Sequence, residues 1–298
     1  MTRSYLKLAQ QGKNSWWRYL LGVLLVLFFW QVLGSIPLLG FVAALEADGD
    51  PATAFNPITL SFEGVAPLVP YLVLNASIIL SLVGLYIAMR WLHQRPFTGL
   101  ITPEYSVSWR RFFQGFGVYF GLIAIATLLE ALIFPGSYQL SFQPGQFFLF
   151  LVFAVMVTPI QASAEELFFR GYLMQGLGLK SRGMVLPVMG SSILFMLPHL
   201  LNPEVQLGFA VMATIYLLFG LFLAVITVQD NRLELAMGAH SANNLFIVLV
   251  ANYDNSALPS PSIWSAELHP QFALVSFVAI AILFYLILLR RSPKRPLH

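Results

Sequence analysis

Residues Glu165-Glu166-Leu167-Phe168-Phe169-Arg170 place three charged side chains inside a hydrophobic segment that runs from about Phe147 to Leu177. A charged side chain at the centre of a bilayer costs roughly 3 kcal/mol or more, so such residues usually face a protein interior and mark a functional site. Two adjacent carboxylates lie four and five positions before an arginine. This spacing indicates one acid held by an ion pair and one acid left free for chemistry.

The composition around this stretch is that of an integral membrane protein. Hydrophobic residues make up 58% of the 298 residues, charged residues only 10%, and the mean hydropathy is +0.77. A soluble domain carries about 25% charged residues. The chain contains no cysteine, which excludes disulfides, thiolate metal sites and a cysteine nucleophile.

Eight hydrophobic runs of about 20 residues follow one another along the chain, each long enough to cross a bilayer as a helix. We therefore predict an all-α fold, a polytopic transmembrane helical bundle of about eight spans. No internal repeat and no loop long enough to fold alone is found, which makes residues 1–298 a single integral membrane domain. The predicted spans are Arg18–Leu45, Val65–Leu92, Phe112–Phe134, Phe147–Leu177, Met184–Leu201, Leu207–Val228, Leu233–Ala251 and Phe272–Leu289.

The basic residues divide very unevenly between the two sides of this map. Fifteen of the 16 Lys and Arg residues fall on one side, and the sixteenth is Arg170. Basic loops stay in the cytoplasm, so we expect both termini to be cytoplasmic, in a multi-pass protein of the inner (cytoplasmic) membrane. The basic residues are Arg3, Lys7, Lys13, Arg18, Arg90, Arg95, Arg110, Arg111, Lys180, Arg182, Arg232, Arg290, Arg291, Lys294 and Arg295. The opposite loops carry Glu46, Asp48, Asp50, Glu63, Glu204, Asp254 and Glu267.

This map also predicts the partners of the chain. Residues 1–15 form a basic segment that we expect to lie on the anionic inner leaflet. The expected partners are the lipid bilayer and a peptide or protein substrate at the cytoplasmic leaflet, and no nucleic acid.

The spacing of the hexapeptide separates the roles of its two acids. On a helix Glu166 and Arg170 are i,i+4 neighbours that can pair directly. Glu165 is rotated about 100° from Glu166 and can point into a cavity. Counting about 1.5 Å per residue from Lys180, Glu165 lies roughly 22 Å from the nearest cytoplasmic charge. Glu165 is therefore the acid without a sequence-local cation.

Two further polar sites lie in hydrophobic spans. His199 ends the fifth span, and His240 and Asn244 lie one helical turn apart on the seventh. By the same count His199 is roughly 25 Å from Arg182, its nearest cytoplasmic charge. His240 and Asn244 are roughly 12 and 18 Å from Arg232. These depths overlap with that of Glu165, so we expect one polar site built from three spans.

The residue types of this site favour hydrolysis. A carboxylate and an imidazole can share the deprotonation of a water that attacks a carbonyl. A second imidazole and an amide NH2 are donors suited to the oxyanion that develops. Glu165, His199 and His240 also match the two-histidine, one-carboxylate set of a catalytic zinc, but the zinc-protease pattern HExxH is absent. We therefore predict no required cofactor, with zinc as the alternative.

Three motifs carry a resemblance to a known family. EExxxR (Glu165, Glu166, Arg170), FxxxH (Phe195, His199) and HxxxN (His240, Asn244), in that order on successive spans, resemble the motifs of the CAAX-protease and bacteriocin-processing (CPBP, Abi) family. The resemblance covers about residues 147–251, which we take as the catalytic core spans. The ordered set is specific, although each motif alone is loose.

The resemblance implies a helical bundle of about eight spans and an intramembrane endopeptidase, similar to the eukaryotic enzyme that removes the last three residues of prenylated CAAX proteins. It implies that Glu165 and His199 activate the water and that His240 and Asn244 bind the oxyanion. Glu166 and Arg170, together with Phe195, are then structural or orienting residues. Members of the family have been described both as metalloproteases and as metal-independent glutamate proteases.

Other classes fit the sequence less well. There is no GxSxG signature of a serine nucleophile, no aspartate pair within the spans and no repeat symmetry of a transporter. The strongest alternative is a catalytically silent membrane scaffold or a bacteriocin-immunity-type protein of the same fold. We predict a protease, because Glu165, His199 and His240 are all present.

Overall fold

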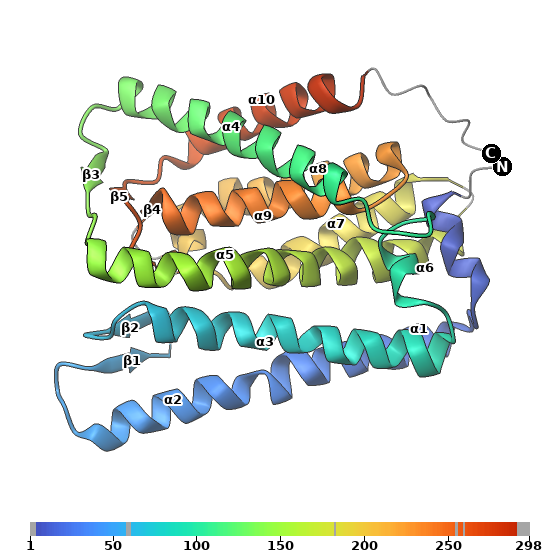
Figure 1. Cartoon of the computed structure of the whole chain (residues 1–298), viewed down its shortest axis with the longest axis horizontal. Helices are drawn as coiled ribbons and strands as arrows, with labels where there is room; N and C mark the ends of the chain where they lie inside the picture. Colours follow the sequence, from blue (N-terminus) through green and yellow to red (C-terminus); the bar gives the residue numbers. More distant parts are fainter. Residues whose placement is uncertain (1–3, 58–60, 182, 254–255, 259, 291–298) are drawn as a thin grey trace.

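The fold is an all-helical membrane bundle, as the sequence predicts (Figure 1). A computed structural model describes residues 4–57, 61–181, 183–253, 256–258 and 260–290. Within them each of the eight predicted spans is helical, and several consist of consecutive helical pieces. The charge map includes Arg3, Arg182, Asp254, Arg291, Lys294 and Arg295, which lie outside the described residues.

The first half of the chain forms the helical pieces η1 (Tyr5–Gln11), α1 (Trp16–Leu27), η2 (Phe28–Leu33), α2 (Ser35–Asp48), α3 (Leu68–Ile87), η3 (Ala88–His93), η4 (Phe97–Leu100) and α4 (Trp109–Ile133). The second half forms α5 (Pro144–Glu166), η5 (Leu167–Leu173), α6 (Met174–Gly178), α7 (Val185–His199), η6 (Pro203–Leu207), α8 (Phe209–Asp230), α9 (Glu234–Leu249) and α10 (Pro270–Leu288). The strands are β1 (Ala54–Asn56), β2 (Ser61–Glu63), β3 (Tyr138–Leu140), β4 (Ala251–Tyr253) and β5 (Trp264–Ala266).

Two of the eight predicted spans are short. Among the described residues, six segments are long and apolar enough to cross a membrane. Helix α7 has 15 residues and α9 has 16, about 23 and 24 Å at 1.5 Å per residue, against a hydrocarbon core of about 30 Å. The six spanning segments are Trp16–Asp48, Leu68–His93, Trp109–Ile133, Pro144–Gly178, Phe209–Asp230 and Pro270–Leu288.

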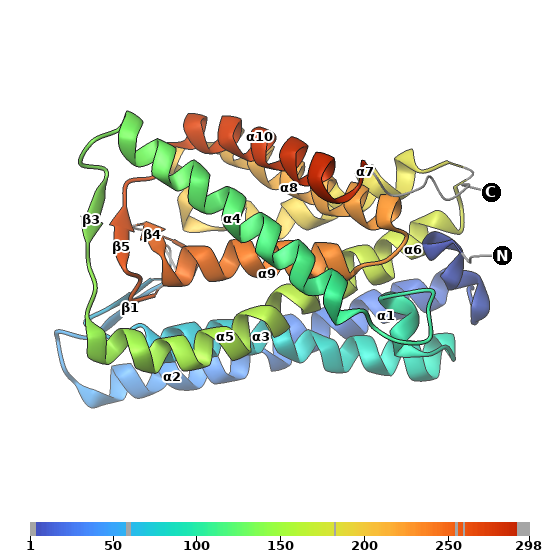
Figure 2. The same cartoon turned by 45° about the horizontal axis from the view of Figure 1, so that its top comes forward.

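Helix α9 forms the centre of the bundle, which explains how a short helix can carry polar residues there. It lies between α4 and α5 (Figure 2) and also packs against α8. Thirteen of its sixteen residues are buried. The outer helices instead leave large apolar side chains exposed, such as Leu24 on α1, Leu128 on α4 and Val275 on α10, as expected for a surface that faces lipid.

The central contact between α4 and α9 depends on two glycines. A Cβ at Gly238 would overlap the carbonyl oxygen of Phe112, and a Cβ at Gly115 would overlap that of Leu235. Small residues allow helix backbones to approach this closely inside a membrane.

We expect Gly238→Ala to destabilise the protein by about 2 kcal/mol, because α4 and α9 would have to move apart. Thermal unfolding in detergent measures this effect. Gly117→Ala on α4 is the matched control, since nothing lies within 4 Å of the added methyl group. Equal melting temperatures for the two variants would contradict the close approach.

The two ends of the bundle differ in structure and charge. The five strands found in the described residues lie at one end (Figure 1), as an antiparallel β1–β2 hairpin and a sheet in the order β3-β5-β4. The described basic residues that precede or follow the spans lie at the other end of the bundle. The segment η1 and the C-terminus of α10 also lie there (Figure 1). This arrangement agrees with the charge map, whereas the cytoplasmic assignment of that end remains a prediction.

The N-terminal segment differs from its prediction. The side chains of Tyr5, Leu8 and Ala9 are buried. The Tyr5 hydroxyl donates to the Leu100 carbonyl at 2.5 Å, and its backbone N–H donates to the Asn231 side chain at 2.6 Å. The prediction that this segment lies on the leaflet surface is therefore wrong for these residues, because their apolar side chains fill the basic end of the bundle.

Candidate active site

Three helices bring the predicted catalytic side chains together. Glu165 lies near the end of α5, His199 at the end of α7 and His240 in the middle of α9. The Oε2 atom of Glu165 is 3.9 Å from Nε2 of His199 and 3.8 Å from Nε2 of His240. All three spans that the sequence assigned to one site therefore meet at a single carboxylate oxygen.

The two oxygens of Glu165 have different surroundings. Oε1 accepts a hydrogen bond from the Gln161 side chain one turn earlier. Oε2 is buried and has no hydrogen-bond partner among the described residues. A buried acceptor of this kind is costly unless a further group occupies the space beside it. Glu165 thus presents one fixed oxygen and one open oxygen to the two histidines.

Glu166 connects the ion pair to His240. Its Oε1 atom accepts from Nη1 of Arg170 at 2.7 Å and lies 2.8 Å from Nδ1 of His240. All three side chains are almost fully buried, and Nη2 of Arg170 donates to the Gly220 carbonyl at 3.1 Å. The predicted i,i+4 pair is therefore present, and it also fixes the orientation of a histidine on a distant helix.

Phe195 makes the corresponding contacts for His199. The Phe195 carbonyl lies 2.8 Å from Nδ1 of His199, and the two rings are 4.3 Å apart. The guanidinium of Arg170 lies 4.2 Å from the centre of the Phe195 ring, a cation–π distance. A carbonyl only accepts, so Nδ1 of His199 carries a proton, and Nε2 faces Glu165.

Asn244 reaches the site through Gln161. Its amide donates to the Gln161 side-chain oxygen at 3.1 Å and its oxygen accepts from Asn243. An amide NH2 has two donors, so one N–H of Asn244 remains for another group. Sequence reasoning gave Gln161 no role, although its i,i+4 spacing from Glu165 was the available signal.

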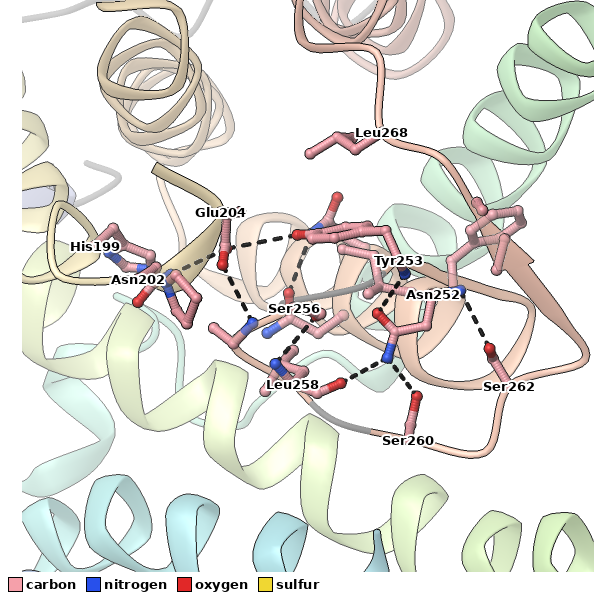
Figure 3. Close-up of a pocket in the computed structure, with 18 of the residues that line it drawn as sticks. His199, Asn202, Glu204, Asn252, Tyr253, Ser256, Leu258, Ser260, Ser262 and Leu268 are labelled. Atoms are coloured by element: carbon pink, nitrogen blue, oxygen red, sulfur yellow. Dashed lines mark hydrogen bonds between the residues drawn. The ribbon is translucent and has the colours of Figure 1, made fainter. Parts of the chain in front are cut away.

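A buried acid beyond His199 was missed as part of the site. Glu204 in η6 accepts from Tyr216 of α8 at 2.5 Å and from the Ala257 N–H at 3.2 Å, and Figure 3 shows it between His199 and Tyr253. Burial and the Glu204 carboxylate raise the pKa of Tyr253, which keeps its hydroxyl a neutral donor. The Tyr216 ring lies 4.9 Å from that of His199. Glu204 thus ties the loops beside His199 together.

The site lies in a large cavity. Its volume is about 930 Å³, and its lining includes Glu165, His199, His240 and Asn244. The lining extends to Asn252 of β4 and to Ser260 and Ser262 in the loop before β5 (Figure 3). The cavity is large enough for a peptide segment, since ligand pockets are commonly about 300–1,000 Å³.

The donor types fit a zinc ion but their spacing does not. Tetrahedral ligands at about 2.1 Å from zinc lie about 3.4 Å from one another, whereas Oε2 of Glu165 is 3.8 and 3.9 Å from the two Nε2 atoms. Within the described part of the chain, no three His, Asp or Glu side chains form a group that could hold a metal ion. The mechanism proposed below therefore contains no metal-dependent step.

Comparison with known proteins adds a family and a relative. A family model described as type II CAAX prenyl endopeptidase Rce1-like matches residues 144–246, the region that carries all three motifs. A Bacillus subtilis (strain 168) protein described as "Uncharacterized protein YyaK" is 32% identical over 278 residues, which cover 92% of this chain and 91% of the relative. No solved structure matches the chain.

Proposed function

Because the chain belongs to the Rce1-like family of type II CAAX prenyl endopeptidases, the family that its three motifs resemble, we propose that it is an intramembrane endopeptidase in which Glu165 and His199 activate water. The family supports a protease role in general. The observation that carries the proposal is the open oxygen of Glu165, which faces two imidazole nitrogens within the cavity.

In the proposed hydrolytic step, a proton moves from water to the Glu165–His199 pair and then to the leaving amine. A water between Glu165 and His199 loses one proton to this pair as its oxygen bonds to the carbonyl carbon of the peptide. The C–N bond then breaks, and the proton passes to the leaving amine. The separations of 3.8 and 3.9 Å are too long for direct hydrogen bonds, and the proposal places the reacting water so that it bridges these atoms.

In the proposed mechanism His240 and Asn244 donate hydrogen bonds to the oxyanion. His240 can donate from Nε2 only when both ring nitrogens carry a proton, and Glu166 is the counter-ion for that form. The free N–H of Asn244 supplies a second donor. Two preorganised donors in a buried site stabilise a tetrahedral intermediate far more than donors in water do.

A test of this function uses the purified protein in detergent with a library of fluorogenic peptides. We expect cleavage that a zinc chelator does not remove, since no step requires a metal. Loss of cleavage with chelator, restored by added zinc, would contradict the metal-independent mechanism. A folded protein that cleaves none of the peptides would favour the silent scaffold.

A further inference from the structure

The cavity reaches the candidate active site from one end of the bundle. On α3, α8 and α10, which start at the strand end, its lining stops at Ile78, Phe219 and Ile280. On α4 and α9, which run the other way, the lining begins at Tyr119 and His240. None of the described residues of η1, η3, η4 or η5 lines it. The cavity therefore extends from the strand end to Glu165 and no further.

The basic end of the bundle is closed. Tyr5 and Leu100 are buried there, and the Tyr5 hydroxyl also lies 3.4 Å from the backbone carbonyl of Arg170. Arg95 donates to the Gln175 side chain at 2.5 Å, and Gln175 donates to the Gly99 carbonyl at 2.9 Å. Among the described residues, these hydrogen-bonded polar side chains pack between Glu166 and the basic end of the bundle, and none of them lines the cavity.

Away from the two active-site histidines, the charged side chains that line the cavity are acidic. Apart from Glu165, its described lining contains Glu130, Glu204 and Glu267 and no Lys or Arg. The donors to Glu204 are amide and hydroxyl groups, which orient the carboxylate without supplying a positive charge. Glu130 accepts from Tyr138 and lies 3.2 Å from the ring of His269. A concave surface with charges of one sign concentrates ligands of the opposite sign.

These observations deepen the proposed function, on which this inference rests. We propose that the substrate is a peptide segment of net positive charge that enters at the strand end of the bundle, the extracytoplasmic face by the positive-inside rule. This direction is opposite to the cytoplasmic leaflet predicted from the sequence. The acidic loops that the charge map placed outside are then the entrance to the site.

The natural lack of cysteine allows a direct test of the entrance. Ser256→Cys and Ser276→Cys each place one thiol on the cavity lining. Ser106→Cys is the matched control, because Ser106 is exposed in the loop before α4 at the opposite end. Each variant is labelled with a membrane-impermeant maleimide in spheroplasts, which expose the outer face, and in inside-out vesicles, which expose the cytoplasmic face.

We expect the cavity thiols to react in spheroplasts and the Ser106→Cys thiol to react only in inside-out vesicles. Reaction of the cavity thiols on the same face as the Ser106→Cys thiol would overturn the inference. This readout does not depend on catalysis. Conversely, a protein with this labelling pattern that cleaves no peptide would contradict the proposed function alone.

The charge preference is tested by protection of the Ser276→Cys thiol. A lysine-containing peptide should slow the labelling of this thiol at a concentration about fivefold lower than that required of a twin peptide in which glutamates replace the lysines. Glu267→Lys at the cavity rim should reduce this difference, whereas Glu46→Lys, exposed on α2 outside the lining, should not. Equal protection by the two peptides, or stronger protection by the acidic twin, would overturn the proposed charge preference.

Discussion

Replacement of Glu165 by glutamine is expected to lower the rate of peptide hydrolysis by about 10³-fold, within the range that a general base contributes. Glutamine keeps the size of the side chain and an oxygen that can accept from Gln161, so the fold should be unaffected. It removes the carboxylate that lies beside both histidines and that the proposal assigns to take a proton from water. The measurement is kcat on a cleaved library peptide, with thermal unfolding recorded on the same samples.

Glu46→Gln is the matched control for this prediction, because it removes an exposed carboxylate on α2 that lies outside the cavity lining. We expect its kcat to remain within about threefold of the wild-type value. Retention of more than a tenth of the wild-type rate by Glu165→Gln would rule out Glu165 as the base. His199→Gln, with a similar loss of rate, would support a shared role in water activation.

Local spacing explains which contacts of this site could be predicted. The pairing of Glu166 with Arg170 follows from i,i+4 geometry on one helix, and the FxxxH and HxxxN spacings place their members on one face in the same way. The helical character of the predicted spans followed from hydrophobic length, whereas six segments of the described residues are long and apolar enough to cross a membrane. These predictions need only the chain within one or two turns of each residue.

The remaining contacts depend on how the helices pack, and no short-range pattern encodes them. The hydrogen bond between Glu166 and His240 joins residues 74 positions apart, and in the proposed mechanism it makes Glu166 the counter-ion of His240. The burial of Tyr5 depends on a vacant space at the basic end of the bundle. The direction of the cavity depends on which ends of the surrounding helices leave space between them. For this reason the prediction made from the basic charge of residues 1–15 is wrong for Tyr5, and no short-range pattern indicated a role for Glu204.

Removal of the Arg170 charge is expected to have the largest effect on stability. Arg170 and Glu166 have no exposed side-chain surface, so Arg170→Met would leave a buried carboxylate without its cation. Loss of one partner of a buried pair costs about 3–5 kcal/mol. Thermal unfolding in detergent, followed by the fluorescence of the six tryptophans, should show a clear drop in melting temperature.

The matched control is Arg232→Met, which removes the cation of a partly exposed pair with Glu104 at 3.3 Å. Such pairs contribute about 0–1 kcal/mol, so its melting temperature should change little. If the two arginine variants unfolded at the same temperature, burial of the Glu166–Arg170 pair would not account for the stability of the bundle.

A double variant, Glu166→Gln with Arg170→Met, separates the structural role of this pair from its proposed catalytic role. It removes both charges together, and replacement of a whole buried ion pair by neutral side chains is often neutral or stabilising. Its melting temperature should therefore recover most of the loss seen for Arg170→Met. Its hydrolysis should not recover, because a glutamine amide can accept a hydrogen bond from Nδ1 of His240 but cannot serve as the counter-ion of a doubly protonated ring. Joint recovery of stability and kcat would mean that the pair acts on the fold alone, and that His240 needs no charge beside it.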